Sequence, residues 1–502
     1  MKMKQNYSAN IMVAQIGKPQ SEFTKADIIN FILDNDIEMV NFRYCGTDGR
    51  LKTLNFCFSS AEQLDSILSC GERVDGSSLF PYIEAGSSDL YVIPRFRTAF
   101  VNPFSEVPAV DILCSYFTKD GQPLESAPQY TMQKAHKVLQ EVTGCMYETM
   151  GELEYYVIMD NVDGKFLTEN QRGYHESSPY NKSGEFRAKC MELIVATGGL
   201  LKYGHSEVGN FILGDKIYEQ NELEFLPTDM EAAADQLLIA KWIVRTLADQ
   251  MGVDVTFAPK ITVGKAGSGM HVHTRLMRNG ANAFVEKGEL TNDAYKSIAG
   301  YLDLAPSISA FGNTIPASYL RLVPHQEAPT NICWGDRNRS ALVRVPLGWS
   351  LGAKDMCAIA NPLEKPSDAD FTQKQTIEFR CPDGSADIYL LMASLAVAVR
   401  HGFEMENAVA YAKDRYIAVN IFHDEHKSVV DGLKQLPASC TESAECLTAQ
   451  RDVYEKYGVF DKNLVDGVIK QLRAFNDSNL RVELEGDEEA MLALVNRHFH
   501  CG

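Results

Sequence analysis

The stretch Glu152-Leu153-Glu154-Tyr155-Tyr156-Val157-Ile158 decides how the rest of the chain is interpreted. It is rich in aromatic and β-branched residues, as is typical of a β-strand. Side chains alternate between the two faces of a strand, so Glu152 and Glu154 share one face while Leu153 and Tyr155 share the other. Two carboxylates on one face repel each other unless water or a cation lies between them. A solvated face and a cation site both satisfy this pattern.

The same pattern recurs in two later segments. Two histidines share one face of the run Gly269-Met270-His271-Val272-His273, which follows a glycine-rich turn. A glutamate and an arginine share one face of the run Thr376-Ile377-Glu378-Phe379-Arg380. A single histidine pair is often structural, but three strands that each back an ionisable face with an apolar one favour a common arrangement. We expect an antiparallel sheet, curved or barrel-like, with a polar funnel on its inner face.

Further ionisable residues lie between these strands. The segments 204–209 and 219–222 contain Glu207, Glu219 and Glu222, which we expect to add carboxylates to the funnel. Carboxylate and imidazole ligands suit Mg²⁺ or Mn²⁺, whereas zinc favours cysteine or more histidine. An arginine cluster follows in the segment 337–344, and forked guanidinium donors suit phosphate or carboxylate. A surface network of salt bridges would have the same composition.

Charge and composition exclude several classes of protein. The chain has 502 residues, 67 of them acidic and 48 basic, for a formal net charge of −19. Such a charge makes the whole molecule a poor partner for nucleic acid or for an anionic membrane. The 12 cysteines form no Cys-x-x-Cys pair, which favours reduced, packed thiols over disulfides or zinc. The apolar run Ile388–Val399 is too short to cross a bilayer, and no secretory signal is visible. We expect a soluble, cytoplasmic protein.

The order of expected elements predicts an α+β protein with two domains. Residues 1–125 combine a helix at 24–35 with short strands at 39–44, 51–58, 90–93 and 110–117, and a Thr-Asp-Gly-Arg turn at 47–50. Residues 126–502 begin with a helix from Pro128 to about Val142 and then alternate strands with long helices. Within them, Thr228 and Glu231 are spaced as a capping box, followed by a periodic apolar run to Met251 and a stop at Gly252.

Seven motifs stand along the chain in a characteristic order. They are Asp75–Ser78, Gly151–Glu154, Glu207–Gly209 with Asn221-Glu222, Gly267–His273, Arg321 with Glu327–Pro329, Asn338–Ala341 and Ile377–Arg380. Taken together, they resemble those of the type I glutamine synthetase family, from about residue 25 to the C-terminus. The resemblance implies an N-terminal β-grasp domain, a catalytic domain with the funnel-like sheet surrounded by helices, and a homo-oligomer. The implied assembly is a dodecamer of two hexameric rings, with each active site built between neighbouring subunits.

The resemblance also implies a role for individual residues. One Mg²⁺ or Mn²⁺ ion would be held by Glu154, Glu207 and Glu222, and a second by Glu152, His271 and Glu378. The nucleotide phosphates would be bound by His273, Arg339 and Arg344, and the carboxylates of the substrate glutamate by Arg321 and Arg380. Gly267 and Glu154 would also contact substrate. Glu327 would close a lid over the intermediate, and Asp75, with Ser78 and Tyr174, would form the ammonium site.

The reaction implied by the family is the ATP-dependent ligation of ammonium to L-glutamate. The substrate's side-chain carboxylate attacks the γ-phosphate of ATP and forms γ-glutamyl phosphate, while the cations and Arg344 neutralise charge. Asp75 then takes a proton from ammonium, and ammonia attacks the acyl phosphate to give glutamine, ADP and phosphate. A closed lid protects the intermediate from water.

The sequence departs from the family pattern at several positions that face substrate. Lys265-Ala266 replaces the usual Asp-Asn pair, Arg275 replaces a serine, Thr376 replaces an arginine, and the loop 79–83 differs from that of the main enzymes. The segment 418–423 lacks the tyrosine motif used for adenylylation, so we expect no such control. Three interpretations remain. The protein is a glutamine synthetase, a ligase of the same family that uses a γ-glutamyl acceptor larger than ammonia such as a polyamine, or a ring-forming relative without catalysis.

Overall fold

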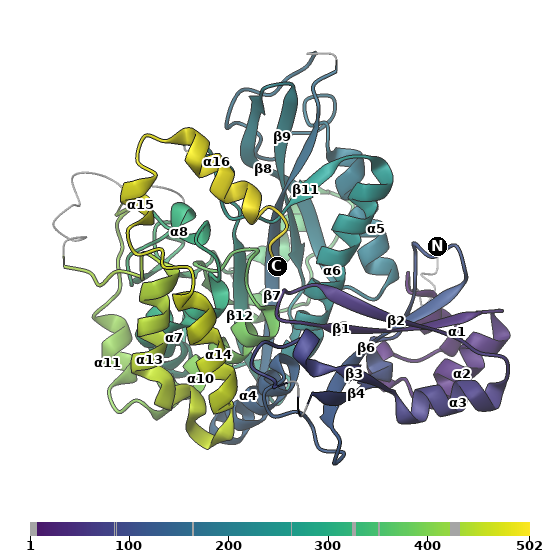
Figure 1. The fold of residues 1–502 in the computed structure, drawn as a ribbon. Helices are drawn as coiled ribbons and strands as arrows, with labels where there is room; N and C mark the ends of the chain where they lie inside the picture. The colour runs from purple at the N-terminus through teal and green to yellow at the C-terminus, as the bar shows by residue number, and fades with distance from the viewer. Residues whose placement is uncertain are drawn as a thin grey trace.

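The computed structural model describes residues 8–502 except 85, 87, 163–164, 263, 324–327, 350–351 and 422–431. In the ribbon of Figure 1 the purple N-terminal part lies to one side of a large central sheet, and most helices of the C-terminal part lie on the other side. The expected α+β organisation is confirmed. The boundary expected after residue 125 falls between strand β6 and helix α4.

The N-terminal domain is built on a sheet with the strand order β2-β1-β6-β4-β3, and β5 pairs with β6. The central pair β1–β6 is parallel and the other pairs are antiparallel. Helix α2 begins at a capping box between Thr24 and Asp27, as the expected helix at 24–35 requires. The sheet and α2 and α3 share one apolar core, which is the expected β-grasp arrangement. The elements are α1 (Ile11–Ile16), α2 (Lys25–Asp34), β1 (Met39–Cys45), β2 (Leu51–Cys57), α3 (Ala61–Cys70), β3 (Glu72–Asp75), β4 (Asp89–Pro94), β5 (Phe100–Val101) and β6 (Ala109–Thr118), with single turns of 3₁₀-helix at Gln20–Glu22, Gly76–Ser78 and Phe96–Thr98.

The catalytic domain is built on a ten-stranded sheet whose main path is β16-β17-β18-β12-β7-β9-β8. Neighbouring strands on this path are antiparallel except β16 and β17, which are parallel, so the sheet is mixed rather than purely antiparallel. The path runs from β16 to β8 as an open sheet, and β8 and β9 form a long hairpin at the top of Figure 1. The strands are β7 (Met146–Asp160), β8 (Leu201–Leu213), β9 (Lys216–Phe225), β10 (Thr228–Asp229), β11 (Asp254–Thr256), β12 (Met270–Arg278), β13 (Ala281–Asn282), β16 (Trp334–Asp336), β17 (Val343–Val345) and β18 (Ile377–Phe379), with a separate pair β14 (Val285–Glu286) and β15 (Glu289–Leu290).

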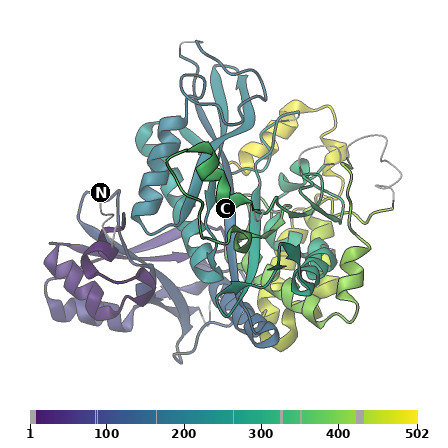
Figure 2. The ribbon, with the colours of Figure 1, turned by 180° about the vertical axis from the view of Figure 1, so that it is seen from behind.

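Helices α6 and α7 both pack on the apolar face of this sheet, where Leu237 of α6 lies against Gly151 and Tyr301 of α7 is hydrogen-bonded to Tyr147. In Figures 1 and 2, α5 and α6 lie nearer the N-terminal domain, and α7, α10, α13 and α14 form a bundle farther from it. The expected apolar helix is α10, most of whose side chains are buried. The helices are α4 (Pro128–Thr143), α5 (Gly184–Ala196), α6 (Met230–Met251), α7 (Asn292–Gly312), α8 (Ser318–Arg321), α9 (Ala353–Ala360), α10 (Ile388–Glu404), α11 (Ala408–Lys413), α13 (Cys440–Glu455), α14 (Lys462–Arg473), α15 (Leu480–Glu483) and α16 (Glu488–Arg497), with 3₁₀ turns at Phe371–Lys374 and Lys456–Gly458.

The start of helix α6 corrects one expectation from the sequence. The N-cap is Asp229, whose carboxylate accepts a hydrogen bond from the backbone N–H of Ala232, and not Thr228. Thr228 is instead extended, because it pairs with Thr149 at the edge of β7 in the short strand β10. The helix ends at Met251 with Gly252 in a left-handed conformation, as expected.

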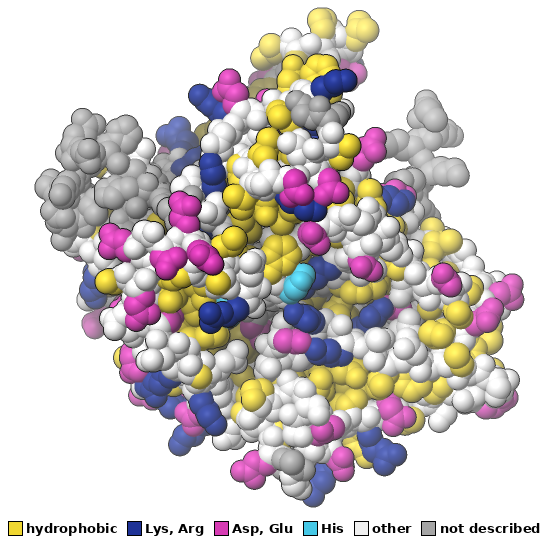
Figure 3. Space-filling view, turned by 45° about the horizontal axis from the view of Figure 1, so that its top comes forward, with side chains coloured by type: hydrophobic (Ala, Val, Ile, Leu, Met, Phe, Trp, Pro, Cys, Tyr) yellow, Lys and Arg dark blue, Asp and Glu magenta, His cyan; other side chains and the backbone are white. Residues whose placement is uncertain are grey.

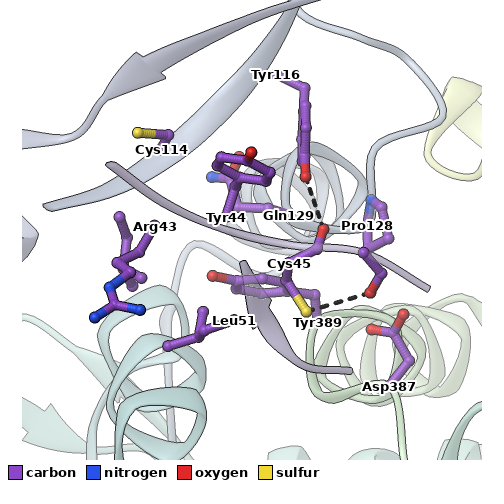
Figure 4. A pocket seen from close by; sticks show the side chains of 12 residues that line it. Arg43, Tyr44, Cys45, Leu51, Cys114, Tyr116, Pro128, Gln129, Asp387 and Tyr389 are labelled. Carbon is purple, nitrogen blue, oxygen red and sulfur yellow. Dashed lines mark hydrogen bonds between the residues drawn. The ribbon is translucent and has the colours of Figure 1, made fainter. Parts of the chain in front are cut away.

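The two domains are joined by a tightly packed, partly ionic contact. Figure 4 shows Tyr44 and Tyr116 of the N-terminal domain packed beside Pro128 and Tyr389 of the catalytic domain, around a residual cavity of only about 10 Å³. Beside it, the Arg95 guanidinium binds both carboxylate oxygens of Asp235, at 2.7 and 2.8 Å. A buried two-point ion pair of this kind fixes orientation, so the domains meet at a defined angle.

Several global expectations can be compared with the described part of the chain. All 12 cysteines carry free thiols. No helix among the described residues is long and apolar enough to cross a membrane. On the face shown in Figure 3, acidic and basic side chains are interspersed, so the net charge does not collect into one acidic surface there.

Candidate active site

The polar residues of the central sheet lie in three rows that run across neighbouring strands. In the first row His205 of β8 is paired with Glu222 of β9, which is paired with Glu154 of β7. In each strand the next residue on the same face lies two positions away, so the rows follow from the strand register.

The second and third rows continue across the sheet toward β17. In the second row Glu224 is paired with Glu152, which is paired with His271 of β12. In the third row His273 is paired with Glu378 of β18, which is paired with Arg344 of β17. The three strands singled out from the sequence are therefore immediate neighbours, and their ionisable faces coincide.

These rows line a cavity of about 1180 Å³. The opposite faces of the same strands are apolar, and Leu153, Val272 and Phe379 are fully buried in the main core. Most of the residues expected from the sequence contribute to the cavity wall. They are Glu152, Glu154, Tyr174, Glu207, Glu222, Gly267, His271, His273, Arg321, Arg339, Arg344, Glu378 and Arg380.

One group of side chains, the sheet-centre cluster, consists of Glu152, His271, His273 and Glu378. Nδ1 of His271 lies 3.0 Å and Nε2 of His273 lies 2.8 Å from the Glu152 carboxylate. The same atoms lie 3.6 and 3.9 Å from Glu378. Although burial acts to raise it, the imidazoles of His273 and His271 hold the pKa of Glu152 well below its ordinary value. The charges in this cluster are thus largely compensated from within the chain.

The second group, the hairpin cluster, consists of His205, Glu207 and Glu222. One ligand atom from each lies within 4.8 Å of the others. Burial and the negative charges of Glu152, Glu154 and Glu207 raise the pKa of Glu222 well above its ordinary value. Carboxylate and imidazole atoms at this spacing are suitable ligands for a divalent cation, which would replace the missing positive charge.

Glu154 was expected among the ligands of the first cation, and the structure gives it further bonds. Its Oε2 atom accepts hydrogen bonds from the backbone N–H of Gly269 at 2.7 Å and from Nε2 of Gln220 at 3.0 Å. Burial raises the pKa of Glu154. The glycine-rich turn therefore fixes one oxygen of Glu154 beside the hairpin cluster.

The turn itself requires glycine for steric reasons. A Cβ atom on Gly267 would lie 2.5 Å from the Pro259 carbonyl oxygen, and one on Gly269 would lie 2.6 Å from a guanidinium nitrogen of Arg321. Substitution at either position would displace the backbone or Arg321. The turn can thus approach the polar face closely enough to orient both Glu154 and Arg321.

Five arginines line the cavity, and four of them were expected there from the family resemblance. Arg344 donates from Nη1 to Glu378 at 2.8 Å, and Arg380 donates from Nε to the same carboxylate at 2.9 Å. Arg321 is held by the Cys381 carbonyl at 2.8 Å. Nε of Arg344 is buried without a hydrogen-bond partner among the described residues. Arg339 completes the set, and together they suit phosphate or carboxylate groups.

Three residues that depart from the family pattern, Lys265, Ala266 and Arg275, form hydrogen bonds or ion pairs within the chain. The backbone N–H of Ala266 donates to the Gln171 side-chain oxygen at 2.7 Å, and Lys265 donates to Asn170 at 3.0 Å. Arg275 forms a cross-strand ion pair with Glu148 at 2.6 Å. Each of these residues thus has a polar partner within this chain.

Thr376, the remaining departure on this wall, contacts a predicted site residue directly. Its hydroxyl lies 2.9 Å from Nδ1 of His273. Nε2 of His273 points to Glu152, which fixes the orientation of the ring.

Two predicted residues, Asp75 and Ser78, do not line this cavity. Glu327 lies outside the described residues. Hydrogen bonds from Ser78 and Ser77 hold the pKa of Asp75 well below its usual range, so it is a carboxylate at neutral pH. Of the three residues expected at the ammonium site, Tyr174 lines the cavity, whereas Asp75 and Ser78 do not.

Sequence reasoning missed some residues of the cavity and misplaced one. Glu219 faces the other side of β9, where its carboxylate accepts hydrogen bonds from the backbone N–H groups of Lys182 and Ser183. Glu224 faces the cavity, as its spacing of two from Glu222 would have indicated. His205, Tyr203, Trp349 and Lys374 also line the cavity. Lys374 lies over the Trp349 ring, 5.7 Å from its centre, and no motif marks this pair.

The two domains match two family models. Residues 36–119 match "Glutamine synthetase, beta-Grasp domain" and residues 125–483 match "Glutamine synthetase, catalytic domain". A glutamine synthetase of Clostridium saccharobutylicum is 28% identical over 431 residues, which cover 84% of this chain and 89% of that protein. A glutamine synthetase of Pyrococcus abyssi is 29% identical over 416 residues, covering 83% and 86%.

Solved structures with the same fold include a GmaS–ADP complex and a glutamine synthetase of Plasmodium falciparum. The former has a TM-score of 0.73 at 18% identity and covers 91% of this chain and 98% of its own. The latter has a TM-score of 0.74 at 18% identity and covers 91% and 97%. The catalytic-domain match spans well over half of the sequence, and the β-grasp match accounts for most of the N-terminal domain. The chain therefore belongs to the glutamine synthetase family.

Proposed function

We propose that the protein is an ATP-dependent ligase that joins ammonium to L-glutamate and forms glutamine, ADP and phosphate. The observation that carries the proposal is the convergence of six sheet strands on one cavity that holds two carboxylate–imidazole clusters and five arginines. Phosphoryl transfer needs little covalent chemistry from the protein, since positioning and charge neutralisation supply most of the acceleration. This cavity offers both.

The donor atoms suggest two divalent cations, Mg²⁺ or Mn²⁺. Glu152, His271 and Glu378 would hold one cation, and Glu207 and Glu222, with Glu154 beside them, would hold the other. When bound, the cations supply Lewis-acid neutralisation of the phosphate oxygens. A formal net charge of −19 makes such local reversal of charge necessary for binding a nucleotide.

The arginines and His273 would handle the substrates. Arg321 and Arg380 would bind the carboxylates of glutamate, and Arg339, Arg344 and His273 the phosphates of ATP. The partnerless Nε of Arg344 is a buried donor available for a phosphate oxygen. The γ-carboxylate of glutamate would attack the γ-phosphate, forming γ-glutamyl phosphate and releasing ADP.

Ammonium capture would require a neighbouring copy of the chain. Asp75 is a carboxylate on the surface of the N-terminal domain, away from its own cavity, and would complete the site of the adjacent subunit in a ring. There it would take a proton from ammonium, with Ser78 and Tyr174 nearby. A ring assembly, such as the dodecamer of two hexamers, follows from this requirement.

A second candidate uses a larger amine as the acceptor in the same chemistry. It is favoured by Ala266, which provides no side-chain hydrogen bond in the cavity, and by the bond from its N–H to Gln171. A small residue at this position leaves room beside the turn.

ATP-dependent phosphate release with glutamate and Mg²⁺ tests both candidates. Ammonium is compared with a panel of primary amines and polyamines, and the products are identified by mass. Glutamine as the main product supports the first candidate, and turnover only with a larger amine supports the second. No phosphate release with any acceptor would contradict both.

The role of Asp75 can be tested separately. Asp75→Asn should lower ammonium-dependent turnover by about 10²-fold, within the range for loss of a general base. Phosphate release without ammonium should change much less. Equal loss of both activities would contradict the role proposed for Asp75.

A further inference from the structure

His205 lies in the cavity wall but is not one of the residues that the family resemblance implies for either cation. It stands on β8, directly opposite Glu222 on β9. Its imidazole is mostly buried, with 13% of the side chain exposed. It belongs to the first row of polar residues, so the groups that face its two ring nitrogens determine what it can bind.

The hydrogen bonding of the ring fixes which nitrogen is available. Nδ1 lies 3.0 Å from the backbone oxygen of Ser206, and a carbonyl oxygen can only accept, so Nδ1 carries a proton. In the neutral ring Nε2 is then the atom with the free lone pair. Histidines that bind metals usually donate their other ring N–H to a carbonyl or carboxylate in this way.

The lone pair of Nε2 faces a carboxylate. Nε2 lies 3.3 Å from Oε2 of Glu222, and ligand atoms of His205, Glu207 and Glu222 all lie within 4.8 Å of one another. Two acceptors at this distance repel each other unless a positive centre lies between them. A divalent cation with ligands on both sides would satisfy this geometry.

Neighbouring rings hold the imidazole in place. The His175 ring centre lies 4.3 Å from that of His205, and those of Tyr174 and Tyr203 lie 5.6 and 5.7 Å away. A ligand held by packing is preorganised, so it loses little conformational entropy when the cation binds.

We propose that His205 binds the cation of the hairpin cluster through Nε2, together with Glu207 and Glu222. The site then has a nitrogen ligand among its oxygen ligands. Imidazole favours transition metals over Mg²⁺, so this site should prefer Mn²⁺ to Mg²⁺ more strongly than a site of carboxylates alone. The inference rests on the cation binding in the proposed function and not on the identity of the amine.

Direct Mn²⁺ binding tests this assignment. Free Mn²⁺ is measured by its electron paramagnetic resonance signal during titration of the full-length protein, without nucleotide, and Mg²⁺ is added as a competitor. His205→Gln should weaken one of two Mn²⁺ sites by at least about tenfold, since even the loss of an outer partner costs about 10–100-fold. Competition by Mg²⁺ at that site should become more effective relative to Mn²⁺.

A control and a second variant keep the result interpretable. His500→Gln removes an exposed imidazole that does not line the cavity and should leave both Mn²⁺ affinities within about twofold of wild type, far from the loss expected for a ligand. His205→Asp replaces the nitrogen ligand by oxygen, so Mg²⁺ binding should recover while the preference for Mn²⁺ is lost. Melting temperatures without metal confirm that each variant is folded.

The His205→Gln variant can also show that His205 is not a ligand of the cation. If His205 were instead a protonated partner of Glu222, His205→Gln would remove a competing positive charge and strengthen Mn²⁺ binding. Stronger or unchanged binding would overturn the assignment. Failure of the wild-type protein to bind any Mn²⁺ would overturn this assignment as well as the cation part of the proposed function. If wild type bound Mn²⁺ tightly and His205→Gln bound it with the same affinity, this inference would be overturned and the proposed function would stand.

Discussion

The sheet-centre cluster and the hairpin cluster lie on the same sheet, yet they differ in how their negative charge is balanced. In the sheet-centre cluster, two imidazoles contact Glu152, and Glu378 accepts hydrogen bonds from Arg344 and Arg380. In the hairpin cluster, Nε2 of His205 lies 3.3 Å from Glu222, and the negative charges of Glu154 and Glu207 act on the same carboxyl group. The first cluster is stabilised by its own chain, and the second requires a cation.

The pKa values follow this difference. Although burial acts to raise it, Arg380 and His273 lower the pKa of Glu378. Burial together with neighbouring carboxylates raises the pKa of Glu222. One sheet thus contains a preorganised anionic site that is ready at neutral pH and another in which binding of a cation must displace protons.

The largest effect is expected from Glu378→Gln. Glu378 is 1% exposed and holds Arg344 and Arg380, so its loss would remove a proposed cation ligand and misplace the groups proposed to bind phosphate and the substrate carboxylate. Turnover should fall by about 10²–10³-fold or more, as when a preorganised charge-stabilising group is removed. ATP-dependent phosphate release measures the effect.

The matched control for this variant is Glu192→Gln, which breaks only a surface pair with Lys189. It should retain wild-type turnover. Retention of activity in Glu378→Gln would mean that the sheet-centre cluster is not part of the catalytic machinery.

Two substitutions should have opposite effects on the stability of the protein in EDTA. Glu152→Gln removes the partner of two imidazoles and should destabilise the fold by about 3 kcal/mol, as for one half of a buried ion pair. Glu222→Gln removes a repelling charge and should be neutral or stabilising. Urea unfolding at pH 7.5 measures both. Equal destabilisation by the two variants would contradict the difference between the clusters.

Stability without a cation should also fall as pH rises. A carboxyl group with a raised pKa keeps its proton in the folded protein where the unfolded chain has lost it, so stability decreases between the ordinary value of 4.5 and the raised value for Glu222. His273 acts in the same direction above 6.5, because Glu152 raises its pKa although burial acts to lower it. Mn²⁺ replaces the protons in the hairpin cluster, so its stabilising effect should grow with pH.

Thermal melting from pH 5.5 to 8.5, with and without Mn²⁺, tests this expectation. At 100 times its dissociation constant, one bound cation adds about 2.7 kcal/mol. The pH dependence in EDTA should be smaller in Glu222→Gln than in wild type. If Glu222→Gln left the pH dependence of stability in EDTA unchanged, that dependence would arise from other groups, such as His273.

Period-two alternation was sufficient to predict most of this site, and its failures are informative. Glu378 and Arg380 were placed together from their spacing, and they form a hydrogen bond. The same rule should have excluded Glu219, which is three residues from Glu222 and faces the other side. His205 could not be found this way, because its pairing with Glu222 depends on a register shift in the β8–β9 hairpin between Ser206 and Asn210.

The fold was predictable for a related reason. Caps and turn residues act locally, so helix α2 and the turn between β1 and β2 could be placed from a few residues. The start of α6 was missed by one residue, because Thr228 is bound to β7 by a contact with a distant segment. Long-range register is set by many residues together, and no short motif encodes it.

The smallest effect is expected from Thr376→Val, which alters the sheet-centre cluster without changing its charge. The Thr376 hydroxyl lies 2.9 Å from Nδ1 of His273, whose other nitrogen contacts Glu152. Loss of this hydrogen bond should cost about 1 kcal/mol, or roughly a fivefold rise in KM for ATP if His273 binds phosphate. Thr372→Val, whose hydroxyl bonds only to Asp370 nearby, is the matched control and should leave this KM unchanged. A Thr376→Val enzyme with an unaltered KM would show that Glu152 and packing are sufficient to orient His273, so the sheet-centre cluster would be even more strongly preorganised than its hydrogen bonds indicate.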